Sequence, residues 1–227
     1  MVRKEKMRIP CAEVLMSQLR RQRTIASGFR LPISAAEAEQ LLTVSYMAEV
    51  RLRGHVPHID SDTKRAISEV AHELTRTDIY PTGIMLCGTP GNGKTTLMYA
   101  LQNAVLWLQE HGMFSQRDEE NHADRIRLVT AKQICTESQR RQLILDYKRQ
   151  AALGIDDLGN EPAEVLSYGN VCSPVVDLIE DRYNTLSFTM VTTNLTGVEL
   201  RKRYGERVVD RMNEMMKIVI FKNASFR

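Results

Sequence analysis

The chain has 227 residues, of which 43% are hydrophobic, and a formal net charge of +3 at neutral pH. This length allows one sizeable hydrophobic core, so one main domain with a small appendage is expected. The four cysteines are scattered without a C-x-x-C pair, which excludes a disulfide framework and a zinc knuckle. No apolar stretch is long enough to span a bilayer, and arginines interrupt the N-terminal apolar run too early for a signal peptide. We therefore expect a cytoplasmic protein without membrane association.

The N-terminal region is strongly basic and predicted to be helical. Residues 1–30 contain eight Lys or Arg against two acids, which favours either an anionic partner or a solvated tail. Apolar residues recur at helical spacing over 11–23, and a second helix is predicted from Ser34, which has capping-box spacing with Glu37. The residues expected on its inward face are Leu41, Leu42, Val44, Met47 and Val50. The connector 54–62 then separates a helical N-terminal region, residues 1–60, from the rest.

A third helix is predicted over 63–76, and a nucleotide-binding motif follows. Residues 83–96 form an apolar strand that runs into the pattern G-x-x-x-x-G-K-[ST] and then into a helix over 97–109. The loop residues are Gly88, Thr89, Pro90, Gly91, Asn92, Gly93, Lys94, Thr95 and Thr96. Its glycines allow consecutive backbone N–H groups and the helix N-terminus to point at a β-phosphate. Lys94 is expected to reach the β- and γ-phosphates of ATP, and Thr95 to bind Mg²⁺.

The remainder of the chain alternates between predicted strands and helices. After a polar insert at 111–124, strands are predicted over 126–130, 151–157, 187–193 and 217–221. Helices are predicted over 131–150 and 171–183, with two short helices before the last strand. This alternation predicts an α/β fold of three layers, in which helices cover both faces of a mostly parallel five-stranded sheet.

Two acids end the strand predicted over 151–157. In a parallel sheet the ligand lies beyond the carboxyl ends of the strands, so Asp156 is expected beside Lys94 and Thr95, where it would hold Mg²⁺. Asp157, one residue further, is expected to orient and deprotonate the attacking water. The structural alternative is a pair of acids that caps the turn before Gly159.

Further polar residues of interest follow the next strand. Asn194 ends that strand, where it would hold the lytic water against the γ-phosphate. Arg207 and Arg211 lie four residues apart, and therefore on one face of a short helix. One of them is expected to reach the nucleotide of a neighbouring subunit; a surface pair bonded to nearby acids is the alternative.

These motifs together resemble the AAA+ ATPases of the DnaC/IstB family. The resemblance covers residues 83–227 and rests on GTPGNGKTT, IDDLG at 155–159, TTN at 192–194, GERVVDRM at 205–212 and the terminal SFR. It implies that Asn194 is sensor 1, Arg211 the arginine finger, Arg227 the sensor 2 arginine that contacts the phosphates in cis, and Arg207 a structural or secondary arginine. With the connector at 54–62 as the boundary, residues 61–227 are expected to form an AAA+ ATPase domain. The residues from 195 to 227 are too few for a helical lid, so a lidless P-loop core is expected.

The resemblance implies a role in DNA replication but leaves the partner open. The first reading is a DnaC-like loader that engages a replicative helicase through residues 1–60, binds single-stranded DNA and forms homo-oligomers with ATP and DNA. Basic residues that would contact phosphates, or form a solvated helix face, are Arg140, Arg141, Lys148 and Arg149. The alternatives are an IstB-like transposition ATPase that binds duplex DNA and recruits a transposase, and a nucleotide-switched adaptor. Residues 1–60 are expected to be dispensable for nucleotide binding.

Overall fold

Five parallel strands form the central sheet. In spatial order these are β2 (Ile126–Thr130), β3 (Ala152–Leu158), β6 (Phe188–Thr193), β1 (Gly83–Gly88) and β7 (Met216–Phe221). The computed structural model describes residues 11–14, 29–78, 81–114, 125–138, 141–167, 170–223 and 225–226. All six residues of β6 are buried, as expected for a parallel strand covered on both faces.

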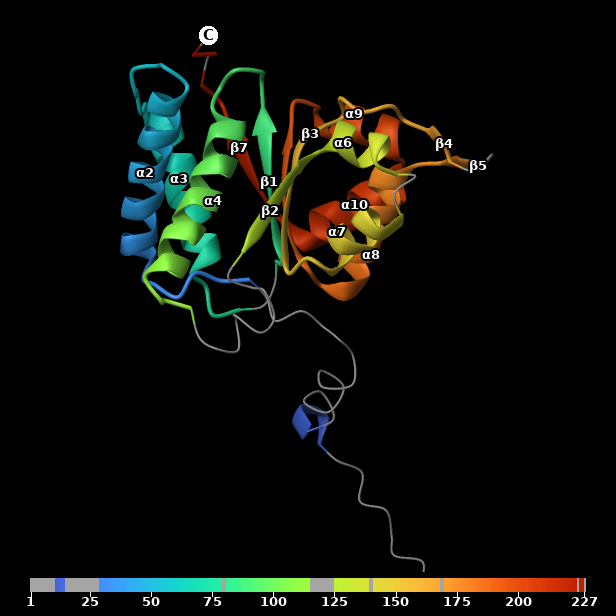
Figure 1. Cartoon of the computed structure of the whole chain (residues 1–227), viewed down its shortest axis with the longest axis horizontal. Coiled ribbons are helices and arrows are strands. Elements are labelled where there is room, and N and C mark those ends of the chain that lie inside the picture. Colours follow the sequence, from blue (N-terminus) through green and yellow to red (C-terminus); the bar gives the residue numbers. More distant parts are fainter. Residues whose placement is uncertain are drawn as a thin grey trace, which may run out of the picture.

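Helices cover both faces of this sheet (Figure 1). One face carries α2 (Ala35–Leu52), α3 (Ser61–Leu74) and α4 (Lys94–Glu110). The other carries α6 (Ala131–Thr136), α7 (Arg141–Arg149), α8 (Pro174–Thr185), α9 (Gly197–Tyr204) and α10 (Glu206–Met215). Each layer buries its own hydrophobic cluster against the sheet. The predicted three-layer α/β fold is therefore confirmed.

The main differences from the predicted elements lie between β2 and β6. The helix predicted over 131–150 is divided into α6 and α7. The helix predicted from residue 171 begins instead at Pro174, whose fixed φ and missing N–H suit the first turn. The residues before it form an antiparallel hairpin of β4 (Val165–Ser167) and β5 (Asn170–Cys172), which the sequence analysis missed.

Helix α2 packs into the same hydrophobic core as α4 and the sheet. The predicted capping box is present, because Glu37 N–H donates to Ser34 Oγ and Ser34 N–H donates to the Glu37 carboxylate. Leu42 and Tyr46 belong to the same buried cluster as the apolar side of α4. The ring centroids of Phe29 and of Phe188, in the sheet, are 4.8 Å apart. The packing therefore does not divide at residue 60: the described part of the N-terminal region, from Phe29 onward, shares the hydrophobic core of the α/β fold.

Within the described residues beyond Asn194 we find α9, α10 and β7 and no helical lid. None of the described helices combines the length and the hydropathy that a bilayer crossing requires. A cavity lies at the carboxyl ends of the strands.

Candidate functional site

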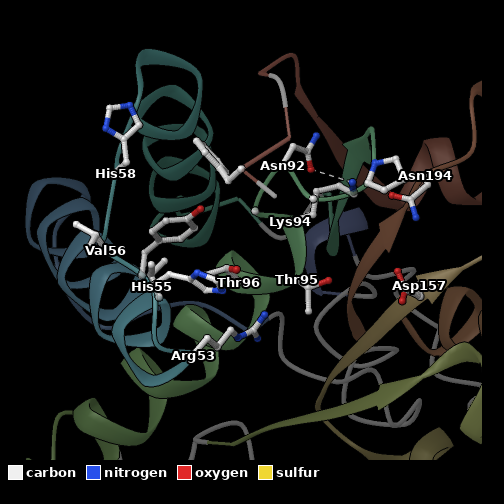
Figure 2. A pocket seen from close by; sticks show the side chains of 16 residues that line it. Arg53, His55, Val56, His58, Asn92, Lys94, Thr95, Thr96, Asp157 and Asn194 are labelled. Atoms are coloured by element: carbon white, nitrogen blue, oxygen red, sulfur yellow. Dashed lines mark hydrogen bonds between the residues drawn. The ribbon is translucent and has the colours of Figure 1, made fainter.

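A cavity of about 490 Å³ opens where β1, β3 and β6 end, a volume typical of ligand pockets. The predicted site residues that line it are Pro90, Gly91, Asn92, Gly93, Lys94, Thr95, Thr96, Asp157 and Asn194. Figure 2 shows Lys94 and Thr95 near the middle of this cavity, with Asp157 and Asn194 on one side. Because the carboxyl ends of parallel strands lie at one edge of the sheet, residues from three separate motifs surround this one cavity.

The P-loop backbone is held in a shape that only glycine tolerates. Gly93 caps the N-terminus of α4 with φ 96°, and Gly91 also has a positive φ of 80°. A Cβ atom on Gly93 would lie 2.3 Å from the Tyr46 hydroxyl, so no side chain fits there. Helix α4 begins at Lys94, three residues earlier than predicted, and has no side-chain cap. Its first N–H groups are therefore available to an anion.

Lys94 is buried and its ammonium group lies within the P-loop. Its Nζ donates to the carbonyl oxygens of Gly88 and Thr89 at 2.7 and 2.8 Å. It also donates to Oδ1 of Asn92 at 2.9 Å (Figure 2). Burial lowers the pKa of Lys94 to about 8, against the opposing effect of nearby negative groups, of which Asp157 is the largest. With a pKa of about 8, the Lys94 side chain is still mostly protonated at neutral pH and carries its positive charge within the loop.

Thr95 and Asp156 meet as predicted. Thr95 Oγ1 donates to Oδ1 of Asp156 at 2.9 Å, and Thr192 Oγ1 donates to the same oxygen at 2.5 Å. These hard hydroxyl and carboxylate oxygens fit Mg²⁺, which binds through one or two protein oxygens together with waters and phosphates. No larger group of His, Cys, Asp and Glu side chains suited to a metal occurs in the described part of the chain. The residues present therefore suit a nucleotide-bound Mg²⁺.

Asp157 occupies an irregular point of β3. Its φ is +56°, and the register with β6 shifts between Ile155 and Leu158. Thr192 accepts a hydrogen bond from the Asp157 N–H at 2.9 Å, and therefore fixes both acids through one hydroxyl. This bulge turns Asp157 into the cavity while Asp156 stays 8% exposed beside Thr95.

The opposite wall of the cavity comes from the segment before the sheet. Its lining residues are Tyr46, Val50, Arg53, His55, Val56 and His58, and Figure 2 shows the last four labelled on the side away from Asp157. Arg53 is held by Glu49 at 3.0 Å and lies over the Tyr99 ring at 5.3 Å. Six residues of the N-terminal region, which the sequence predicted to be dispensable for nucleotide binding, thus line the same cavity as the P-loop. No sequence motif marks these residues, because only the packing of α2 on α4 brings them here.

The C-terminal tail crosses the P-loop. The Phe226 N–H donates to the Gly91 carbonyl at 3.0 Å, and the Phe226 ring lines the cavity 6.3 Å from the ring of His58. Asn223 donates to the Asn92 carbonyl at 3.3 Å. Arg227, the predicted sensor 2 residue, lies outside the described residues, so its contact with phosphates stays a prediction. Phe226 belongs to the terminal SFR motif noted in the sequence, but its place in the cavity was not predicted, and Asn223 was not noted at all.

Comparisons with known proteins agree with this geometry. A family model described as RNA helicase matches residues 84–195, which run from β1 to just past Asn194. The crystal structure of the DnaC helicase loader superposes with a TM-score of 0.56 at 23% identity, over 75% of this chain and 96% of that one. DnaI gives 0.54 at 17% identity, over 74% of this chain and 88% of that one. The chain has the fold of a DnaC-like AAA+ ATPase.

A replication initiator shares this AAA+ fold. The structure of DnaA bound to AMPPCP and single-stranded DNA gives a TM-score of 0.51 at 17% identity, over 74% of this chain and 49% of that one. Among curated proteins, none matches the chain in sequence. The resemblance stated from the motifs is thus confirmed at the level of the fold.

In this DnaC-like fold the two arginines of α10 have different surroundings. The Arg211 side chain is 20% exposed, forms an ion pair with Glu180 of α8 and lies over the Tyr183 ring at 5.3 Å. The Arg207 side chain is 77% exposed and stands 3.8 Å from the same carboxylate. Neither lines the cavity of its own chain as the described residues form it. The assignment of Arg211 as the finger stays a prediction.

Proposed function

We propose that this chain is an ATP-hydrolysing AAA+ protein that loads a replicative helicase onto single-stranded DNA. The observation that carries the ATPase proposal is the convergence of Lys94, the Thr95–Asp156 pair, Asp157 and Asn194 on one cavity. An adaptor without hydrolysis would not need to keep this complete set. The partner proposal rests on the DnaC-like fold, since the similar structure is that of a helicase loader.

The residues divide the cavity into two chemical halves. Lys94 and the first N–H groups of α4 would bind the phosphates, while Thr95 and Asp156 would hold Mg²⁺, which would supply positive charge against the phosphates. Asp157 accepts the proton of the attacking water, and Asn194 orients that water. The opposite wall, with its valines and histidines and with Phe226, receives the base and ribose.

The basic N-terminal segment carries the helicase contact in this proposal. Because α2 shares the ATPase core, the contact is assigned to residues 1–28, which hold seven of the eight Lys or Arg of residues 1–30. Deletion of residues 1–28 should preserve ATP binding and abolish association with a replicative helicase. Deletion of residues 1–54 removes Leu42 and Tyr46 from the core and should abolish ATP binding as well.

A pull-down with a hexameric replicative helicase, and in parallel with a transposase, tests this assignment. The matched variant replaces Arg20, Arg21 and Arg23 by Gln, which keeps the chain length and removes three charges. Helicase binding that survives the 1–28 deletion would contradict the loader arrangement. Binding to a transposase and to no helicase would favour the IstB-like alternative.

Single-stranded DNA binding is proposed for the basic end of α7. Lys148 stands 3.4 Å from Asp181, and Arg149 is exposed; Arg140 lies outside the described residues. Substitution of Arg149 by Gln should weaken DNA binding and reduce the slope of log K against log salt by about 0.7 for each phosphate that the protein no longer neutralises. An unchanged slope in a salt titration would remove α7 from the DNA-binding surface.

A further inference from the structure

A buried carboxylate closes the turn that follows Asp157. Glu161 is 5% exposed, and its Oε2 accepts a hydrogen bond from the Gly159 N–H at 2.8 Å. Gly159 has a φ of +103°, and a Cβ atom there would lie 2.5 Å from the Leu195 side chain, next to Asn194. Glu161 therefore fixes the turn after β3, which lies against Leu195 just beyond the end of β6.

The other oxygen of the same carboxylate holds the end of α9. Glu161 Oε1 accepts a hydrogen bond from the Tyr204 hydroxyl and stands 3.5 Å from Nη2 of Arg203. Arg203 also donates to the main-chain carbonyl of Glu161. One side chain thus joins the turn after β3 to the last two residues of α9, 42 and 43 positions away in the sequence.

The helix with the predicted finger begins directly beyond this contact. Gly205, with a φ of +83°, separates α9 from α10, and α10 carries both Arg207 and Arg211. The contact at Glu161 therefore sets the position of the α10 N-terminus relative to Asp157. A buried carboxylate with both oxygens bonded is costly to release in a low dielectric, so the turn and the helix end should move together.

We propose that Glu161 is a positioning residue that couples the nucleotide site of one subunit to the α10 arginines that serve the neighbouring subunit. This inference rests on the proposed function, because it requires ATP hydrolysis at a shared site. A shift of the turn beside Asp157 would pass through Glu161 to Tyr204, and from there to α10. The carboxylate transmits position and makes no contact with the nucleotide.

A comparison within the chain separates this role from simple stabilisation. Glu73 is equally buried at 5% and pairs with Arg76 at 3.3 Å, but Glu73 lies in the last turn of α3 and Arg76 just beyond it, and the pair joins no two elements of the site. Helix α9 has its own N-terminal capping box, from Thr196 to Glu199. Substitution of Glu161 should therefore break the link between α9 and the turn after β3, while the capping box that begins α9 stays intact.

The first experiment compares Glu161→Gln with the matched control Glu73→Gln. Glu161→Gln should leave the dissociation constant for ATP within about threefold, while kcat of the assembled protein falls about 10- to 100-fold, the range expected from a misplaced group. Glu73→Gln should change neither value. Tyr204→Phe, which keeps the charge pair and removes one hydrogen bond, should give a smaller fall in kcat. Lower thermal stability of Glu161→Gln with an unchanged kcat would overturn the proposal.

The second experiment tests the action on the neighbour. Arg211→Ala subunits, which keep an intact nucleotide site, are mixed with Asp157→Asn donors, which should bind ATP without hydrolysing it, or with Asp157→Asn/Glu161→Gln donors. The single-variant donors should restore hydrolysis and the double-variant donors should not. Equal restoration by both donors overturns the coupling role and leaves the shared site standing. If the single-variant donors restore nothing, although the parental protein assembles, the shared site itself is rejected and the coupling role with it.

Discussion

The Thr95 hydroxyl donates to Oδ1 of Asp156 over 2.9 Å, and this bond ties the first turn of α4 to the end of β3. Thr95→Val keeps the shape of the side chain and removes the hydroxyl. The gain in ATP affinity that Mg²⁺ provides should fall about tenfold, the equivalent of one hydrogen bond of about 1.4 kcal/mol. Calorimetric titrations with Mg²⁺ and with EDTA measure this gain. Thr136→Val, which alters a hydroxyl on α6 that donates to the Lys132 carbonyl, should retain all of it.

Asp157→Asn should separate binding from hydrolysis. The bulge turns Asp157 into the cavity, whereas Asp156 and its bond to Thr95 are untouched by the substitution. ATP should therefore bind with nearly parental affinity while the hydrolysis rate falls by about 10²- to 10⁴-fold, the contribution typical of a general base. A phosphate-release assay with saturating ATP gives the rate. Hydrolysis at the parental rate would show that Asp157 is not the base.

ATP binding should weaken as the pH rises through about 8. Burial lowers the pKa of Lys94 to about 8 from 10.5, and only the ammonium form attracts the phosphates. The unfolded chain keeps this proton up to pH 10.5, so between pH 8 and 10.5 the unfolded state binds more protons. The free energy of unfolding contributed by this group therefore increases with pH across that window. Lys94→Ala should bind ATP poorly at every pH and lack this part of the stability profile, measured by calorimetry and by denaturant titration.

Arg211→Ala should depress hydrolysis only where subunits meet. A finger arginine is worth roughly 10³ to 10⁵ in rate, and Arg211 is held by Glu180 away from the cavity of its own chain. ATP affinity of the dilute protein should therefore be unchanged, while the activity that appears on assembly with DNA should disappear. Arg207→Ala is the matched comparison. If Arg207→Ala abolishes this activity and Arg211→Ala keeps it, the more exposed arginine is the finger.

Arg182→Met should destabilise the fold without touching the site. The guanidinium is fully buried and donates to the Thr189 hydroxyl and to the carbonyls of Tyr147, Gln150 and Phe188. Removal takes the guanidinium donors away from these buried acceptors, so the free energy of unfolding should fall by about 1–3 kcal/mol. Chemical denaturation measures the decrease. ATP affinity of the remaining folded protein should be parental, and Arg207→Met, on an exposed side chain, should cost little.

The sequence predicted the phosphate half of the site and missed the opposite half for a physical reason. Parallel strands place their carboxyl ends at one edge, so Lys94, Asp156 and Asn194 were expected together before any packing was known. Tyr46 and His58 reach the cavity because α2 packs on α4, and no local pattern reports that contact.

Helix α2 also has features that the local sequence predicts and features that depend on tertiary packing. The capping box of Ser34 and Glu37 is a local signal and was predicted correctly. Val44 was expected to face inward but is 53% exposed, since the buried stripe of α2 runs through Ala38, Leu42 and Tyr46 instead. Helical periodicity in the sequence predicts that α2 has an apolar face. Which residues lie at the middle of that face depends on how α2 packs against its partner helix.

The contact between Tyr46 and the P-loop has a practical consequence for anyone who dissects or grafts this domain. A fragment that starts at Gly83 retains every nucleotide-binding motif of the sequence. Such a fragment nevertheless lacks the side chain packed behind Gly93 and one whole wall of the cavity. We therefore expect a fragment that begins at Gly83 to bind ATP poorly although it carries the motifs, and a transplanted domain to require the residues that precede α2.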